Sequence, residues 1–126
     1  MSHEIDVEEA KRLIEEGATV VDVRTDEEFA AGHIPDSVHA SMDAFAAHLG
    51  ALEGREPMVL VCEIGEASGQ AARLLDSYGG VEGDDVYNMA GGLEAWDGEL
   101  VVGEEDENDE DGEESAGSAE SPAGEV

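Results

Sequence analysis

Along the first hundred residues, short apolar runs alternate with segments whose apolar residues recur at helical spacing. The runs at 19–23 and 58–61 are rich in β-branched and large aliphatic residues, which is typical of buried strands in a parallel sheet. Val86-Tyr87 predicts a third strand. Helices are expected between Asp6 and Gly17, over 26–31, over 42–52, through 71–78 before two glycines, and after the glycines at 91 and 92.

Two of these helices carry further signals. Asp6 is placed to cap the first helix, and Glu9 has the spacing that completes a capping box. In the fourth helix, apolar residues at positions i, i+3, i+4 and i+7 predict the buried face. These residues are Ala71, Leu74, Leu75 and Tyr78.

Strands that alternate with helices at this spacing predict an α/β domain over residues 1–103, with a parallel sheet covered by helices on both faces. The remaining 23 residues, 104–126, include eleven acidic residues and one apolar residue larger than alanine, Val126. A segment of this composition buries too little apolar surface to offset the entropy lost on ordering. We therefore expect 104–126 to be an acidic disordered tail.

The chain is strongly acidic, since 34 Asp and Glu against five Lys and Arg give a formal net charge of −29. Without the eleven acidic residues of 104–126, 23 acidic residues face the same five basic ones, a charge of −18. Nucleic acids and anionic membranes are bound through Lys and Arg, so neither partner is expected. The sequence has no apolar stretch of the roughly 18 residues that a membrane helix needs and no basic, apolar leader, which predicts a cytoplasmic protein.

Self-repulsion of this size opposes a compact state at low ionic strength. In molar salt the screening length falls to about 3 Å, and the repulsion largely vanishes. Many acidic residues, a single lysine and 4% aromatic residues form the composition expected of a protein from a salt-rich cytosol. We therefore expect a halophilic origin.

The chain has one cysteine, Cys62, which excludes an internal disulfide, a CxxC redox pair and a Cys-rich zinc site. Cys62 ends a predicted strand, and ligands of parallel sheets bind beyond the carboxyl ends of the strands. The loop from Cys62 to Ser68 leads into a predicted helix, and Gly65 permits a left-handed turn that directs backbone N–H groups inward and favours a thiolate. A lone cysteine is otherwise usually a small buried hydrophobe, and spacing alone leaves both interpretations open.

Two motifs resemble the signatures of the rhodanese family. The first, Asp22-Val23-Arg24 with Glu28-Phe29 and Gly32-His33-Ile34-Pro35, is similar to D-V-R…E-F/Y…G-H-I-x-G-A. The second, Asn88-Met89-Ala90-Gly91-Gly92-Leu93-Glu94-Ala95-Trp96, is similar to N-x-x-G-G-I-x-A-W. Cys62 falls between them in the position of the family's active-site cysteine, and the resemblance covers residues 4–102.

The resemblance implies a three-layer α/β/α domain with a central parallel sheet of about five strands. It also implies a sulfurtransferase in which Cys62 takes sulfane sulfur from thiosulfate or a persulfide donor and becomes a persulfide. The outer sulfur then passes to cyanide, a small thiol or a partner protein, because the chain has no second cysteine, and no cofactor is required. The expected site comprises the catalytic Cys62, the loop residues Glu63, Ile64, Gly65, Glu66, Ala67 and Ser68, and the supporting residues Asp22 and Arg24.

The loop departs from the family pattern in its charges. Members that act on thiosulfate commonly carry Arg directly after the cysteine and near the end of the loop, where this chain has Glu63 and Ala67. Glu66 adds a further negative charge, and carboxylates beside the sulfur disfavour a thiolate and repel an anionic donor, so a persulfide donor is at least as well supported as thiosulfate. The start Cys-Glu-Ile also resembles the Cys-Glu-Phe of phosphatases with this fold. Those enzymes need an arginine in the loop, whereas the nearest here is Arg73, so phosphatase activity is not expected.

A second interpretation stays open, namely a non-catalytic rhodanese-like module that binds a partner or senses oxidants through its thiol. The retained cysteine and glycine of the loop favour the enzyme, and the missing arginines favour the module. Arg24 and Glu28 are expected to be structural, as an ion pair or a hydrogen-bonding set, and not catalytic. Ser68 is expected to cap the helix or to place a hydroxyl near the sulfur, and Asp22 to orient loop amides or to bind neighbouring backbone. We expect a monomer without bound metal, since the histidines lack metal-ligand spacing.

Overall fold

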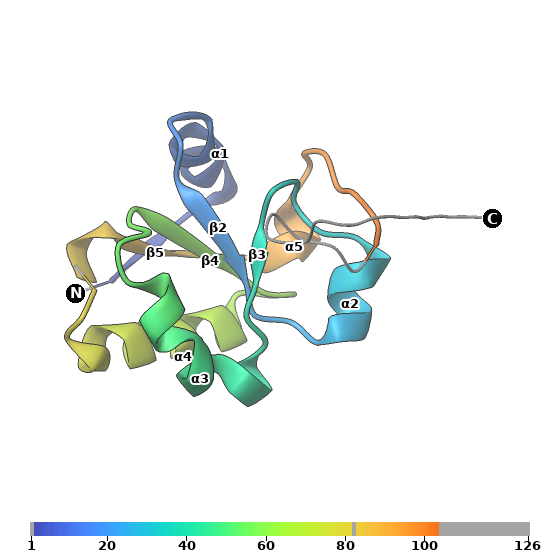
Figure 1. Ribbon diagram of the computed structural model, residues 1–126. Coiled ribbons are helices and arrows are strands. Elements are labelled where there is room, and N and C mark those ends of the chain that lie inside the picture. Colours follow the sequence, from blue (N-terminus) through green and yellow to red (C-terminus); the bar gives the residue numbers. More distant parts are fainter. Residues whose placement is uncertain (1, 82, 104–126) are drawn as a thin grey trace.

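The structure, a computed structural model, describes residues 2–81 and 83–103. Five strands form one sheet in the order β1-β5-β4-β2-β3 (Figure 1), and every pairing between these strands is parallel. They are β1 (His3–Ile5), β2 (Thr19–Asp22), β3 (Val38–His39), β4 (Met58–Val61) and β5 (Val86–Met89). The predicted α/β class and five-stranded parallel sheet are confirmed. The expected tail, 104–126, lies outside the described residues.

Helices connect the strands and cover the sheet. They are α1 (Val7–Glu15), α2 (Asp26–Ala31), α3 (Phe45–Leu52), α4 (Glu66–Tyr78) and α5 (Gly92–Ala95), with 3₁₀ turns η1 (Met42–Ala44) and η2 (Gly83–Asp85). In Figure 1, α3 and α4 lie together on one side of the sheet, and α1 lies on the other. Among these described helices, none combines the length and the apolar character needed to cross a bilayer.

The alternation of side chains along β4 divides the core between the two faces of the sheet. Met58 and Leu60 pack with the apolar residues of α3 and α4, whereas Val59 and Val61 pack with those of α1 and α5. Cys62, the next residue, continues the first series. The sulfur therefore emerges on the face covered by α4, at the carboxyl end of the central strand.

The hydrophobic pattern did not predict β1 and β3. These strands have three and two residues, respectively, and neither contains an apolar run. They exist because β5 and β2 offer backbone hydrogen bonds along their free sides. The predicted third strand extends to Met89, and the predicted helix over 42–52 begins as the 3₁₀ turn η1 before α3.

The predicted buried face of α4 is partly wrong. Ala71 and Leu75 are fully buried, but Leu74 is 43% and Tyr78 38% exposed. The buried residues are Ser68, Ala71, Ala72 and Leu75, which have the expected i, i+3, i+4, i+7 spacing but start three residues earlier. The pattern missed this phase because its first member is a polar serine.

Two helices begin with the capping interactions that short polar residues supply. The Asp6 carboxylate accepts the backbone N–H of Glu9 at 2.9 Å, as predicted, while the Glu9 side chain pairs with Arg12. At the start of α2, Thr25 and Glu28 form a complete capping box that was not predicted. Glu28 is thereby tied to its own helix, which bears on the site described next.

Candidate active site

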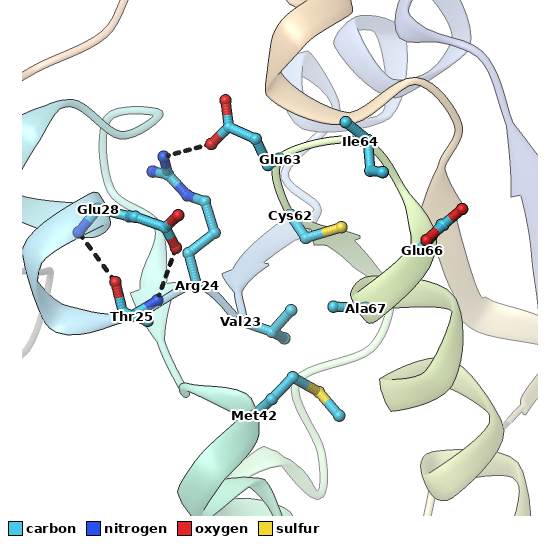
Figure 2. Close-up of a pocket in the computed structure, with 10 residues that line it drawn as sticks. All are labelled: Val23, Arg24, Thr25, Glu28, Met42, Cys62, Glu63, Ile64, Glu66 and Ala67. Atoms are coloured by element: carbon cyan, nitrogen blue, oxygen red, sulfur yellow. Dashed lines mark hydrogen bonds and ion pairs between the residues drawn. The ribbon is translucent and has the colours of Figure 1, made fainter.

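Cys62 is buried in the core and also borders a cavity. Its side chain is only 4% exposed, yet it lines a cavity of about 340 Å³. In Figure 2 the sulfur points toward the region between Ile64 and Ala67, and Arg24 and Glu63 lie on the other side. The cavity is lined by Val23, Arg24, Thr25, Glu28, Met42, Cys62, Glu63, Ile64, Glu66 and Ala67.

The loop after Cys62 turns back so that one amide faces the sulfur. The backbone N–H of Gly65 donates to Cys62 Sγ at 3.0 Å. Gly65 has φ of +97°, and a Cβ there would lie 3.1 Å from Gly91 N and 3.3 Å from Met89 O. Glycine is therefore required both for the left-handed conformation and for the close approach of the β5–α5 turn.

The turn at Gly91-Gly92 supports the loop from behind. The carbonyl oxygen of Cys62 accepts the N–H of Leu93 at 2.8 Å, and that of Glu63 accepts the N–H of Glu94 at 3.0 Å. A Cβ on Gly92 would lie 2.5 Å from Cys62 O. The loop after Cys62 and the second motif, which lie far apart in the sequence, are thus joined by backbone contacts. Gly92 therefore has a role at the site that the sequence did not reveal.

The helix α4 begins beside Cys62, at the edge of the cavity. In a 13-residue helix such as α4, the first N–H groups have no intrahelical acceptor, and the N-terminus carries a partial positive charge. Glu66 and Ala67, in this first turn, line the cavity beside Cys62. The site therefore offers neutral donors to a negative charge on or near the sulfur.

Ser68 and Asn88 close the buried side of the sulfur. Ser68 is fully buried, and its Oγ lies 3.3 Å from Cys62 Sγ. The same hydroxyl bonds to Oδ1 of Asn88, which is 7% exposed. The N-cap of α4 is Gly65, without a side-chain cap, so the expected capping role of Ser68 is wrong and the hydroxyl near the sulfur is correct.

Asp22 and Arg24 form a buried ion pair on the opposite side of the cavity. The Asp22 carboxylate, fully buried, accepts from the backbone N–H of Arg24 at 3.0 Å and from Nη2 at 2.9 Å. Of the two roles considered for Asp22, binding of neighbouring backbone is the one observed. Burial alone lowers the pKa of the Arg24 guanidinium, but its hydrogen bonds and attraction to Asp22 outweigh burial and raise that pKa.

The remaining nitrogen of Arg24 faces the loop. Nη1 lies 3.5 Å from Oε1 of Glu63, a side chain that is 51% exposed (Figure 2). Of the two structural roles expected for Arg24 and Glu28, a direct ion pair between them is not observed. Each instead takes part in a separate set of bonds, Arg24 with Asp22 and Glu63, and Glu28 with Thr25. Of the described residues that line the cavity, Arg24 is the one cation, and three are glutamates.

The domain is of the α/β class, and its cysteine loop lies between a central strand and a long helix. These two features define a class of protein, and comparison with known families agrees with it. The model of the Rhodanese-like domain matches residues 6–99. The chain belongs to this family.

Its relatives include enzymes and solved structures. The thiosulfate sulfurtransferase GlpE of Pseudomonas savastanoi pv. phaseolicola is 40% identical over 89 residues, which is 71% of this chain and 81% of the relative. GlpE of Pseudomonas fluorescens (strain Pf0-1) is 43% identical over 89 residues, 71% of this chain and 79% of the relative. The crystal structure of a rhodanese-like domain protein from Staphylococcus aureus has a TM-score of 0.69 and 33% identity, covering 79% of this chain and 97% of that one.

The structure brings together the residues that the sequence placed at the site. The loop from Cys62 to Ser68 curls around the sulfur, and Arg24 lies across the cavity, held there by Asp22. Asn88 is the first residue of the second motif but had no predicted role. Its polarity within an otherwise apolar strand, VYNM, is the signal that could have singled it out.

Proposed function

We propose that this protein is a sulfurtransferase that carries sulfane sulfur as a Cys62 persulfide. The Cys62 thiolate attacks the sulfane sulfur of the donor, a new S–S bond forms, and the donor leaves with the electron pair of the broken bond. The leaving group is sulfite from thiosulfate, or a thiolate from a persulfide. An acceptor, cyanide or a thiolate, then attacks the outer sulfur and returns the thiolate.

One observation carries this proposal: the Cys62 sulfur accepts a hydrogen bond from the Gly65 N–H at 3.0 Å and also borders a cavity of about 340 Å³. The donor from Gly65 and the N-terminus of α4 stabilise negative charge without a change in geometry during the reaction. The relatives at about 40% identity, named thiosulfate sulfurtransferases, support the same chemistry. Since the chain has a single cysteine, the sulfur must leave to an external acceptor.

The charges around the cavity bear on the donor. Glu28, Glu63 and Glu66 line it and oppose the approach of the thiosulfate dianion. Arg24 is engaged by Asp22 and Glu63. We therefore propose that a persulfide donor is used more efficiently than thiosulfate, and that high salt improves the use of thiosulfate.

A non-catalytic module is the second candidate. The observation in its favour is the loop itself, in which glutamate and alanine occupy the positions where thiosulfate-active members commonly carry arginine. Such a module would react with an oxidant or bind a partner without turning over a sulfur donor.

Cyanolysis separates the two candidates. We would measure thiocyanate formation by the full chain in molar KCl, first with thiosulfate and then with a small-molecule persulfide, with Cys62→Ser as the control. The enzyme gives turnover that depends on Cys62, and mass spectrometry shows one added sulfur atom after donor treatment. Absence of turnover with both donors, together with absence of the sulfur adduct, rejects the enzyme in favour of the module.

A further inference from the structure

Ser68 and Asn88 form a chain of hydrogen bonds that ends at the nucleophile. The Ser68 hydroxyl lies between Cys62 Sγ, at 3.3 Å, and Asn88 Oδ1. Both residues are buried: Ser68 has no exposed surface, and Asn88 is 7% exposed. Water therefore has little access to exchange these bonds, and each proton must be assigned to one partner.

The orientation of the Asn88 amide follows from its second contact. Its Nδ2 donates to the carbonyl oxygen of Gly65 at 3.1 Å. Rotation of the amide by half a turn would place Oδ1 against that carbonyl, acceptor against acceptor. Oδ1 therefore faces Ser68, and it can only accept.

A hydroxyl has one proton and two lone pairs. Because Asn88 Oδ1 cannot donate, the Ser68 proton lies on the bond to Asn88, and the lone pairs of Ser68 Oγ face the sulfur. We propose that Asn88 and Ser68 are positioning residues that make the Ser68 oxygen an acceptor for the S–H of Cys62, so that the resting site holds the protonated thiol.

The three states of the sulfur differ in how well this arrangement suits them. In this assignment the thiol is satisfied twice, because its proton bonds to the Ser68 oxygen, 3.3 Å away, and its sulfur accepts from the Gly65 N–H. A thiolate keeps the Gly65 bond but faces a lone pair of Ser68, unless the hydroxyl turns and leaves Asn88 Oδ1 without a donor. In a persulfide the inner sulfur bears no proton and the charge lies on the outer sulfur, so Ser68 stays with Asn88.

Ser68 and Asn88 therefore favour the thiol and the persulfide over the free thiolate between them. The effect of Ser68 and Asn88 on the catalytic cycle rests on the proposed function. The assignment of the hydrogen bonds does not depend on that function. The charged groups that line the cavity beside Cys62 are Glu63 and Glu66 from the loop and α4, Arg24 beyond β2, and Glu28 from α2. All four are the same in the variants below, so differences between variants report on Ser68 and Asn88.

The test is the pH profile of Cys62 alkylation by iodoacetamide. The full chain is used in molar KCl, and its single cysteine makes the adduct mass unambiguous. The variants are Ser68→Ala, Asn88→Ala and the double variant. Ser77→Ala, at an exposed position of the same helix, is the matched control and leaves the profile unchanged.

In Ser68→Ala the thiol loses its acceptor, so the alkylation midpoint moves to lower pH and alkylation below the midpoint becomes about three- to tenfold faster. In the Asn88→Ala background the freed hydroxyl can turn and donate to the thiolate. Removal of Ser68 from that background then moves the midpoint to higher pH. The effect of Ser68 thus changes sign with the residue at position 88, which a purely structural role does not produce.

A midpoint that rises or stays unchanged in Ser68→Ala overturns the proposal, since Ser68 would then donate to the sulfur or play no part. An effect of the same sign in both backgrounds overturns the role of Asn88. If Asn88→Ala does not fold, as judged by circular dichroism, the sign for Ser68→Ala alone decides. Alkylation requires no sulfur donor, so failure of this proposal is distinct from failure of the cyanolysis assay.

Discussion

Cys62 meets different chemistry on its two sides. A neutral wall, made of Gly65 and Ser68, contacts the sulfur directly. A charged wall, made of Asp22, Arg24 and Glu63, lies across the cavity. On the side of α4, the contacts to Cys62 are neutral and short, from the Gly65 amide and the Ser68 hydroxyl. On the side of β2, the groups are charged, and Arg24 is shared between buried Asp22 and half-exposed Glu63. We expect substitutions in the neutral wall to change the reactivity of the sulfur, and substitutions in the charged wall to change which molecules approach it.

This difference has a physical basis. Backbone donors fixed by a turn cost no desolvated charge and are not screened by salt, so they act equally in dilute and concentrated electrolyte. Partly exposed charges interact over longer distances and weaken as the ionic strength rises. In a chain with a formal net charge of −29, the two walls should respond differently to salt and to substitution.

The largest expected effect is the response of the whole fold to salt. The acidic excess over residues 1–103 repels itself in dilute buffer, so we expect the melting temperature to fall by roughly 10 °C or more between molar and millimolar KCl. Scanning calorimetry measures this, with sucrose as a stabiliser that does not screen charge. A melting temperature indifferent to KCl contradicts both this prediction and the inferred halophilic origin.

Removal of Asp22 should have the next largest effect, because it breaks the buried ion pair of the charged wall. Asp22→Ala leaves the Arg24 guanidinium, whose side chain is 8% exposed, without its carboxylate, and should lower the free energy of unfolding by about 3–5 kcal/mol. Urea unfolding in molar KCl measures the loss. Asp43→Ala, at an exposed position, is the control and should change it by less than about 0.5 kcal/mol.

Gly92→Ala tests the support of the neutral wall. Gly92 has φ of +60°, and a Cβ would lie 2.5 Å from backbone atoms of Cys62 and Glu63. Strain and displacement together should lower the free energy of unfolding by about 2–4 kcal/mol and abolish the proposed sulfur transfer. Gly17→Ala is the matched control, because it shares the positive φ but has no atom within 4 Å. Equal losses in the two variants would show that the contact with the loop is unimportant.

Glu63→Gln should produce the smallest effect, and on function only. It frees Nη1 of Arg24 and removes one negative charge from the cavity, so kcat/KM for thiosulfate should rise about three- to fivefold in dilute buffer. In molar KCl the ratio of kcat/KM between Glu63→Gln and the unchanged protein should approach one. The shift of the alkylation midpoint in Ser68→Ala should persist there. Glu15→Gln, at the exposed end of α1, matches the change in charge. Persistence of the Glu63→Gln gain in molar KCl would mean that it is not electrostatic.

The central strands and the helices were predicted from the local pattern of apolar residues. The strands around residues 19–23 and 58–61 and the helix through 71–78 were expected because runs and periods of apolar residues are properties of the sequence alone. The structure begins that helix earlier, at Glu66. The two edge strands were missed because their identity comes from pairing with a neighbour and not from their own residues. The phase of α4 was missed for a related reason, since the burial of Ser68 follows from its contact with Cys62 and Asn88.

The sequence by itself determined the order of the helices and of the three longer strands, the excess of negative charge, and a single cysteine three residues before a glycine that permits a tight turn. These follow from periodicity, composition and the conformational freedom of individual residues. Only the tertiary structure decided which charges pair and which hydroxyl faces the sulfur. Asn88 and Gly92 contact the loop after Cys62 although they lie far away in the sequence. Arg24 pairs with Asp22 and Glu63 and not with Glu28. Such choices depend on distances and burial that exist only once the sheet has formed.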